Sequence, residues 1–374
     1  VRRRENRSAS SHAPQSKHGA NEVNMKRLLT AAACLALVAC GARDPYGSDG
    51  KGPDSNVASS GKAADPHALT GLSKVPEISD PAPVKGAFQQ KLPVTVKDVE
   101  GNSVTVTDTS RILALDVNGT LSRTVIALGY GDRLVGRTVS STEKRLARLP
   151  VVTQSGHQLN AESIIALKPS VILADRSVGP PEAIDQIKAT GIPVVLVDPH
   201  RSVASAGKLI ETVAHALGAD DAGAALAKRT EGEIAAAKKQ IAQWTPKRKV
   251  DVAFLYVRGT AGIFFILGKD DGATELIEGV GGNDVASAKG LGSTTPASAE
   301  ALASTNPEVI FVMEQGLKST NGVKGLLARP GVSQTRAGQK KRVVAIPDGV
   351  ALAFGPQTGE TLIAIAKALY GVRG

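Results

Sequence analysis

The chain has 374 residues, enough for two domains of ordinary size. It carries 45 Lys and Arg against 35 Asp and Glu, a formal net charge of +10. This basic excess is modest for the length and gives no reason to expect nucleic-acid binding.

Residues 25–39 have the pattern of a secretory signal. A basic start at Met25-Lys-Arg27 precedes a short apolar run that is too short to span a bilayer. The run ends in Leu37-Val-Ala-Cys40, which resembles the bacterial lipobox, where the cysteine receives lipid. We therefore expect cleavage before Cys40 and an extracytoplasmic protein attached to the cell membrane by lipid on Cys40. Residues 1–24 are interpreted as an upstream extension, with Met25 as the start.

Cleavage would change both the charge and the cysteine count. Loss of residues 1–39 removes seven basic and two acidic residues and leaves a net charge of +5. Cys40 would then be the one cysteine, so no disulfide is expected and packing must supply the stability. Residues 40–85 are rich in Gly, Ser, Asp, Pro and Lys, which predicts a flexible tether.

The first globular region is predicted over residues 86–201. It begins with a β-hairpin over 92–107, where apolar and polar residues alternate around Glu100-Gly-Asn102. Strand-like and helical runs then alternate, which predicts a parallel sheet covered on both faces. The expected strands are 112–117, 171–174 and 194–197, and the expected helices are 121–128, 161–167 and 181–190.

Residues 202–245 form a helical linker between this region and a second one over 246–374. Gly218-Ala-Asp220 separates two helices, and the second, 221–244, is roughly 35 Å long at the usual rise. The second region repeats the alternation of the first. Its expected strands are 250–257, 309–313 and 343–346, and its expected helices are 273–279, 299–304 and 360–369. A long helix between two α/β lobes would permit only small relative motion.

Two segments of the chain are repeated. Residues 161–173 read AESIIALKPSVIL, residues 299–311 read AEALASTNPEVIF, and 115–120 likewise echoes 255–260. The offsets, 138 and 140, are nearly the same and predict two similar lobes with a cleft between them for a ligand. Positions at which the lobes differ are then the best candidates for chemistry.

Three residues break this symmetry. His157 lies in a Gly- and Asn-flanked loop, and its counterpart in the second copy is Thr295. Tyr256 and Arg258 lie two apart at the end of the second lobe's first strand, so they share one face. That end of a strand borders the ligand crevice in open α/β sheets.

The chemistry of this trio suits ferric iron, a hard cation that favours a phenolate oxygen. An arginine beside Tyr256 would stabilise the phenolate by a charge-assisted hydrogen bond, and His157 would supply a second ligand. The alternative is a surface-loop histidine, a packed tyrosine and a solvent-facing arginine. His200 and His215 are interpreted as structural.

This layout resembles the substrate-binding proteins of bacterial ABC importers for haem, siderophores and cobalamin, over roughly residues 105–374. The resemblance implies an α/β fold of class III, with two Rossmann-like lobes joined by a long rigid α-helix. The Gly-His-x-Leu-Asn loop and the Leu-Tyr-x-Arg-Gly strand end are similar to haem-binding lipoproteins of Gram-positive importers. That similarity implies His157 and Tyr256 as axial ligands of transported haem b, with Arg258 stabilising the phenolate. The residues that bind the haem propionates are not assigned; Arg137 and Lys144 are candidates only because of their location in the loops of the first lobe.

Glu162 and Glu300 form a mirror pair at the starts of the repeated helices, where an acid suits the positive helix end. The resemblance implies that such acids dock onto arginines of a membrane permease. It also implies that a monomer delivers haem to the permease and ATPase of the importer, with upstream haem-donor proteins as further partners.

The sequence leaves three alternatives to a haem receptor. A ferric siderophore or cobalamin receptor of the same fold would leave His157 and Tyr256 without an iron bond. A receptor for a bare metal ion would need three or four converging ligands. An enzyme is not expected, because no nucleophile elbow, Cys/His pair or paired carboxylates occur. The glycine-rich run 279–284 follows a helix, so it is read as a turn and not as a nucleotide-binding loop.

Overall fold

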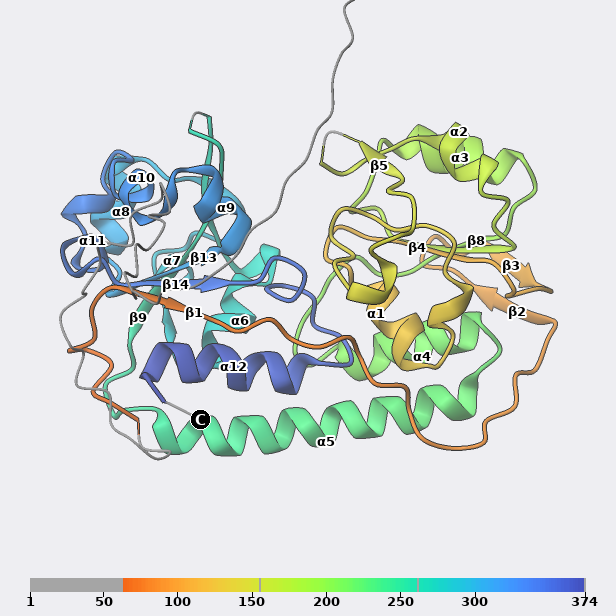
Figure 1. Cartoon of the computed structure of the whole chain (residues 1–374), viewed down its shortest axis with the longest axis horizontal. Coiled ribbons are helices and arrows are strands. Elements are labelled where there is room, and N and C mark those ends of the chain that lie inside the picture. Colours follow the sequence, from red (N-terminus) through yellow and green to blue (C-terminus); the bar gives the residue numbers. More distant parts are fainter. Residues whose placement is uncertain (1–62, 155, 261, 373–374) are drawn as a thin grey trace, which may run out of the picture. The chain divides into compact units, whose positions relative to one another are not determined.

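The computed structural model describes residues 63–372, with the exception of residues 155 and 261. The predicted extension 1–24, the signal 25–39 and the lipidated Cys40 lie outside the described residues. The described chain forms two α/β lobes whose cores share one long helix, α5 (Asp220–Trp244), seen in green in Figure 1. In the described part, no helix has the length and apolar character needed to cross a bilayer.

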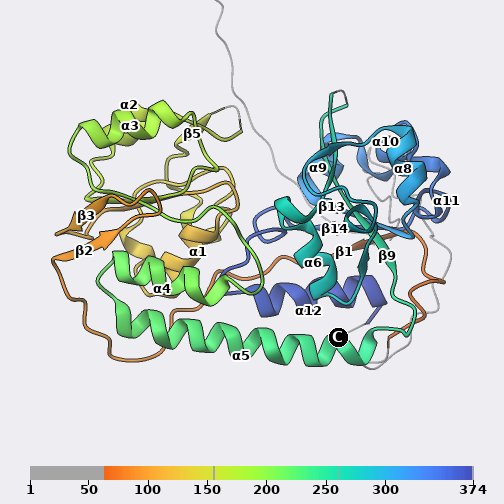
Figure 2. The same ribbon diagram turned by 180° about the vertical axis from the view of Figure 1, so that it is seen from behind.

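The first lobe is built on a parallel three-stranded sheet. Its strands, in spatial order, are β4 (Ile112–Leu115), β7 (Val171–Ala174) and β8 (Val194–Leu196). The helices on the two faces are α1 (Thr120–Ala127) and α4 (Ala206–Ala216) on one side, and α2 (Ala161–Ala166) and α3 (Pro181–Ala189) on the other. Successive strand residues belong alternately to the two cores, as a sheet covered on both faces requires. The predicted parallel sheet of this lobe is confirmed. Figure 2 shows α2 and α3 at the top of the lobe and α1 and α4 below them.

Two small hairpins accompany this sheet. The predicted hairpin is formed by β2 (Val94–Lys97) and β3 (Ser103–Val106), which pair antiparallel. A second hairpin, β5 (Thr153–Gln154) with β6 (Gln158–Leu159), leads into α2 and was not predicted.

The second lobe has a seven-stranded mixed sheet. Its spatial order is β1 (Leu72–Lys74), β14 (Val343–Ile346), β13 (Val309–Met313), β9 (Asp251–Arg258), β10 (Ile263–Leu267) and β12 (Thr295–Pro296), with β11 (Asn283–Asp284) also beside β9. The three predicted strands β9, β13 and β14 pair in parallel, as expected. Strands β1, β10 and β12 were not predicted: β1 is parallel to β14, whereas β12 is antiparallel to β10 and β10 is antiparallel to β9. The reason is a tight connection after β9, with Gly259 and Gly262 at positive φ, which turns the chain straight back and leaves no room for a crossover helix.

The helices of the second lobe also cover both faces of its sheet. One face packs on α5, α6 (Ala273–Gly279) and α12 (Thr358–Tyr370). The other packs on α7 (Val285–Ala288), α8 (Ala299–Thr305), α9 (Glu314–Ser319), α10 (Gly322–Leu327) and α11 (Arg336–Lys340). Short 3-10 turns are η1 (Gly131–Arg133), η2 (Lys144–Leu146), η3 (Lys269–Asp271) and η4 (Val332–Gln334).

Helix α5 packs into one hydrophobic core of each lobe. Leu226, near its start, is buried in the core of the first lobe. Ile234, Ile241 and Trp244 are buried in the core of the second lobe, at spacings that keep them on one face of the helix. The helix is about 37 Å long at 1.5 Å per residue. Its first part packs in the first lobe, and its last part packs in the second lobe.

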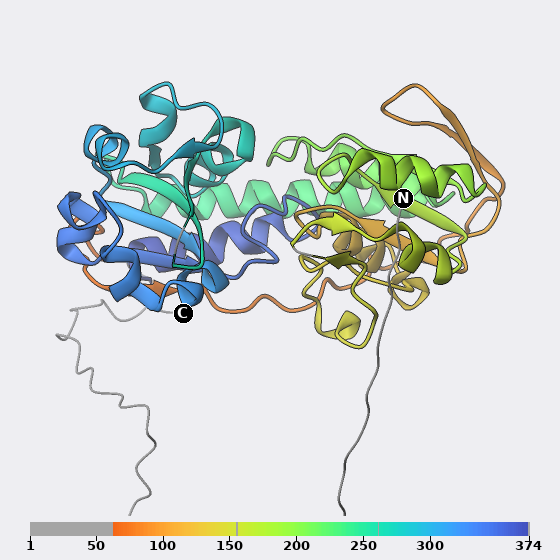
Figure 3. The same cartoon turned by 90° about the horizontal axis from the view of Figure 1, so that it is seen from above.

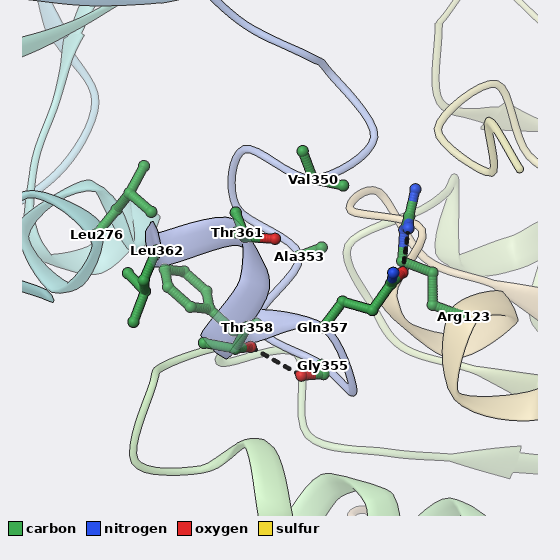
Figure 4. A pocket seen from close by; sticks show the side chains of 10 residues that line it. Arg123, Leu276, Val350, Ala353, Gly355, Gln357, Thr358, Thr361 and Leu362 are labelled. Atoms are coloured by element: carbon green, nitrogen blue, oxygen red, sulfur yellow. Dashed lines mark hydrogen bonds between the residues drawn. The ribbon is translucent and has the colours of Figure 1, made fainter. Parts of the chain in front are cut away.

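A second connection joins α1 to the segment before α12. Arg123 donates from Nε to the carbonyl of Gly349 at 3.1 Å and from Nη1 to Oε1 of Gln357 at 2.7 Å (Figure 4). The hydroxyl of Thr120 donates to the carbonyl of Ala353. These buried hydrogen bonds tie the lobes together beside the covalent link through α5.

Residues 63–85 correct the prediction of a tether over 40–85. Strand β1 lies within this range and pairs in parallel with β14, and Val75 is buried in the core of the second lobe. His67 is held between Glu308 and Arg248, with Nδ1 3.1 Å from Oε2 of Glu308. Glycine and proline made this stretch look disordered, but an edge strand can pair through its backbone with little help from apolar side chains. Residues 40–62 lie outside the description.

The same segment then reaches the first lobe. Asp80 accepts hydrogen bonds from the backbone N–H groups of Lys144 and Arg145, at 2.8 and 2.9 Å. The N–H of Val84 donates to the carbonyl of Ala127 at 2.7 Å. The segment, orange in Figure 3, is therefore a third link between the lobes.

Candidate functional site

His157 lies in the turn between β5 and β6. Gly156 takes a φ of +92°, which favours glycine, and the carbonyl of His157 accepts from the N–H of Gly179 at 3.3 Å. The side chain is half-buried. Its Nδ1 is buried, and no hydrogen-bond partner for it exists among the described residues. Burial lowers the pKa of His157, and the positive charge of Arg258 lowers it further.

Tyr256 lies on β9, opposite Phe265 of β10. Its side chain is half-buried and packs at the margin of the second lobe's core. Within the described part of the chain, its hydroxyl has no hydrogen-bond partner. Among the described residues, therefore, no side chain competes with a ligand for the phenol oxygen.

Arg258 contacts Tyr256 differently from the prediction. Its guanidinium carbon lies 4.6 Å from the centre of the Tyr256 ring, over the ring face. The predicted hydrogen bond to the hydroxyl is not among the hydrogen bonds of the described residues. Nη2 of Arg258 instead donates to Oδ1 of Asp348 at 2.8 Å. The guanidinium still places a positive charge beside the phenol ring.

Asp348 was missed from the sequence. It directly follows the Pro at the end of β14, and its second oxygen accepts from the N–H of Gln315 at 2.9 Å. The carboxyl ends of β9, β13 and β14 meet at one edge of the sheet, so an acid after β14 would be expected near Arg258. The position of Asp348 directly after the third parallel strand is therefore the sequence feature that could have identified it. Asp348 fixes the guanidinium over the tyrosine ring.

The pKa of His157, on the first lobe, is affected by a charge on the second lobe. His157 belongs to the first lobe and Arg258 to the second, yet the charge of Arg258 is felt at the imidazole. The charge of Arg258 on the second lobe thus adds to the effect of burial on the imidazole of the first lobe. A neutral imidazole, a free phenol and a fixed cation can together hold a hard metal centre with an anionic partner.

Glu162 and Glu300 occupy equivalent places on the two lobes. Each lies in the first turn of its helix, α2 or α8, and each is exposed. Asn160 caps α2 by accepting from Ser163 N at 2.8 Å, and Ser298 caps α8 by accepting from Ala301 N at 3.1 Å. The repeat is thus a capped helix followed by a parallel strand in both lobes.

The remaining candidates divide into buried and exposed groups. Arg137 is half-buried and, among the described residues, its buried Nε has no partner, whereas Lys144 is exposed. Asp116, the counterpart of Tyr256, is fully buried and accepts from Thr120 N at 2.8 Å, which is a structural role. Burial, followed by the charge of Asp175, raises the pKa of Asp116 to about 7.

The two predicted structural histidines each pair with an acid. Nδ1 of His200 lies 2.9 Å from Asp198, and Nδ1 of His215 lies 2.8 Å from Asp220. All four side chains are largely exposed. Across residues 63–372, apart from the two gaps, no group of three or more His, Cys, Asp or Glu is arranged to hold a metal ion.

One small cavity lies beside the interlobe hydrogen bonds of Arg123. Val350, Gly355 and Leu362 are among its lining residues (Figure 4). Its volume is about 10 Å³, which is the size needed for one water molecule. It is too small for an organic ligand and lies apart from the Tyr256–Arg258 pair.

Comparisons with known proteins agree with this architecture. The periplasmic binding protein family matches residues 117–350. The crystal structure of the heme binding protein HmuT is 49% identical, with a TM-score of 0.81, and the match covers 83% of this chain and all of that one. The periplasmic heme-binding protein RhuT from Roseiflexus sp. RS-1 is 34% identical, with a TM-score of 0.66, covering 71% and 99%. An uncharacterized ABC transporter substrate-binding lipoprotein, YvrC of Bacillus subtilis, is 27% identical, covering 74% and 86%.

Three of the solved HmuT structures are single-residue variants, in which a histidine, a tyrosine and an arginine are replaced by alanine. Those three positions have the same order and spacing along HmuT as His157, Tyr256 and Arg258 have along this chain. Since the matched family consists of substrate-binding proteins, the expectation that the chain is not an enzyme is confirmed. The chain belongs to the periplasmic binding protein family, in its class III form with two lobes joined by a long helix.

Proposed function

We propose that this protein is an extracytoplasmic, lipid-anchored haem receptor that delivers haem to an ABC permease. The transported ligand is haem b, held between the lobes. His157 from the first lobe and Tyr256 from the second are its axial ligands, and Arg258 stabilises the tyrosinate. Lipid on Cys40 attaches the protein to the membrane.

The observation that carries this proposal is the Tyr256–Arg258 pair, in which the guanidinium carbon lies 4.6 Å from the centre of the phenol ring. On the other lobe, the buried Nδ1 of His157 has no partner among the described residues, and the charge of Arg258 contributes to lowering the pKa of this histidine. The imidazole is kept neutral, as iron coordination requires, and the phenol has no competing partner within the described residues. A ferric porphyrin has two open axial positions on opposite sides of a flat ring, which suits one ligand from each lobe.

The comparisons support the same proposal. HmuT and RhuT are described as heme-binding, and the trio recurs in HmuT at the same spacing. YvrC is described as an ABC transporter substrate-binding lipoprotein, in accord with a permease partner and a lipidated Cys40.

The test is a titration of hemin into purified residues 41–374, followed by absorption. We expect saturation at one haem per protein, with a Soret band that changes in both Tyr256→Phe and His157→Ala. Each change should weaken the affinity by about tenfold or more, because tenfold corresponds to ~1.4 kcal/mol and an iron bond is lost. His200→Ala, an exposed histidine on the same lobe as His157, is the matched control and should behave as the unchanged protein. A titration without a saturable change would reject haem in favour of a siderophore or cobalamin.

A further inference from the structure

The cross-strand register places an apolar row beside Tyr256. In the antiparallel pair of β9 and β10, Tyr256 is opposite Phe265 and Arg258 is opposite Ile263. Phe265 is in turn opposite Pro296 on β12. Directly opposed residues point to the same face of a sheet, so these side chains share the face that carries Tyr256.

This row continues the hydrophobic core beyond its edge. The next pair towards the core on the same face, Phe254 with Leu267, is buried under α5, α6 and α12. Phe265, by contrast, is half-buried and packs into none of the hydrophobic clusters formed by the described residues. Ile263 is 44% exposed. The protein therefore leaves a phenyl ring and an isoleucine partly in water beside its phenol and guanidinium.

The neighbouring aromatic residue shows that this exposure is specific to one face. Phe264 points to the opposite face, packs on the other core of the second lobe, and has the guanidinium carbon of Arg329 5.2 Å from its ring centre. The same strand thus packs Phe264 into a hydrophobic core and leaves Phe265 half-buried, outside the hydrophobic clusters of the described residues.

Exposed apolar side chains also accompany His157 on the first lobe. Val139 and Val151 are each 41% exposed, and they lie next to the strand β5 that precedes His157. The N–H of Val139 donates to the hydroxyl of Thr153 at 3.0 Å, and Val151 forms a β-bridge with Arg137. Exposed apolar side chains thus occur beside the strand that precedes His157 as well as on the face that carries Tyr256.

We propose that Phe265 and Ile263 form an apolar wall that packs against the porphyrin ring, and that this wall selects a flat hydrophobic ligand. The inference rests on the proposed function and extends it to specificity. Burying a side chain of this size strengthens binding about tenfold or more, a gain that a polar siderophore would not make on the same surface. The iron ligands then set coordination, while the β10 wall sets preference for the macrocycle.

Iron-free protoporphyrin IX is the probe that separates the two contributions, because it lacks the metal and keeps the ring. Its binding, followed by fluorescence, should weaken about tenfold in Phe265→Ala and several-fold in Ile263→Ser, given the free energy of apolar burial. The haem complexes of both variants should keep the absorption spectrum of the unchanged protein, since His157 and Tyr256 remain. Val99→Ser, an exposed apolar residue outside this face, is the matched control and should bind protoporphyrin normally.

Comparing the two variants separates a loss of porphyrin binding from a loss of folding. Ile263 is exposed, so Ile263→Ser should unfold at the same temperature as the control even if Phe265→Ala does not. If both bind protoporphyrin within twofold of the unchanged protein while haem still binds, the wall is rejected and the haem receptor survives. If the unchanged protein binds haem but not the iron-free ring, the wall alone is rejected; if it binds neither, both the wall and the proposed function are rejected.

Discussion

At the scale of single residues, the proposed haem site requires a neutral His157. Its pKa is lowered first by burial and then by the charge of Arg258. Since a protonated imidazole cannot bind iron, a lowered pKa extends the pH range of coordination downward from the ordinary value of 6.5. The same shift costs stability in acid, because the unfolded chain takes up the proton more readily than the folded protein.

Replacing Arg258 should move this titration in a defined direction. In Arg258→Gln the electrostatic cause is removed and burial remains, so the pKa of His157 should rise yet stay below 6.5. NMR of the imidazole in the ligand-free protein measures it directly. Arg329→Gln removes an arginine of the same lobe that stacks on the other face of β10, and it should leave the titration unchanged. An equal shift in both variants would contradict the placement of Arg258 near His157.

Single residues also show what the sequence could and could not predict. His157, Tyr256 and Arg258 were found because they break an internal repeat, which a sequence displays directly. Asp348 was not found, because its role depends on which strand ends are neighbours in the sheet. The stacking of Arg258 on the tyrosine ring was not predicted either, since it requires the competing partner Asp348 to be known.

At the scale of elements, buried strands and amphipathic helices were predictable and edge elements were not. Strands 171–174 and 309–313 were placed to the residue because they are continuous apolar runs bounded by turn residues. Strand β10 was missed although it is as apolar, because only the tight turn at Gly259 and Gly262 identifies it as a hairpin partner of β9. Strand β1 was missed because its pairing is made by backbone groups.

The corrected role of residues 63–85 leads to a stability prediction. Val75 is 4% exposed in the core of the second lobe, whereas Leu72, three residues earlier, is 41% exposed. Val75→Ala should lower the free energy of unfolding by about 2 kcal/mol, while Leu72→Ala should stay within about 0.5 kcal/mol. Denaturant unfolding of both variants is the measurement. A flexible tether would make both changes neutral, so equal stabilities would refute the strand assignment.

At the scale of the whole molecule, three connections join the lobes: helix α5, the hydrogen bonds of Arg123, and the segment around β1. A ligand site supplied by both lobes needs their separation to be held constant, and this arrangement supplies that constraint. The prediction of a rigid linker came from the uninterrupted helical pattern of 221–244. The other two connections lie far apart in sequence and required the structure.

The exposed acids of the two lobes predict a separation between binding and delivery. Glu162→Ala together with Glu300→Ala should leave haem affinity unchanged, because both side chains are exposed at helix starts and neither is a proposed haem ligand. Haem-dependent uptake by cells should nevertheless fall, since the proposed docking charges are lost. Glu182→Ala, an exposed acid in the first turn of α3, is the control. Undiminished uptake in the double variant would remove these acids from the docking surface.

The most direct measurement of the central claim is a crystal structure of the haem complex. It should show a single iron bonded to the imidazole of His157 on one side of the porphyrin and to the phenolate of Tyr256 on the other, with Arg258 beside the phenolate. A porphyrin bound elsewhere, or an iron without both of these side chains, would contradict the account.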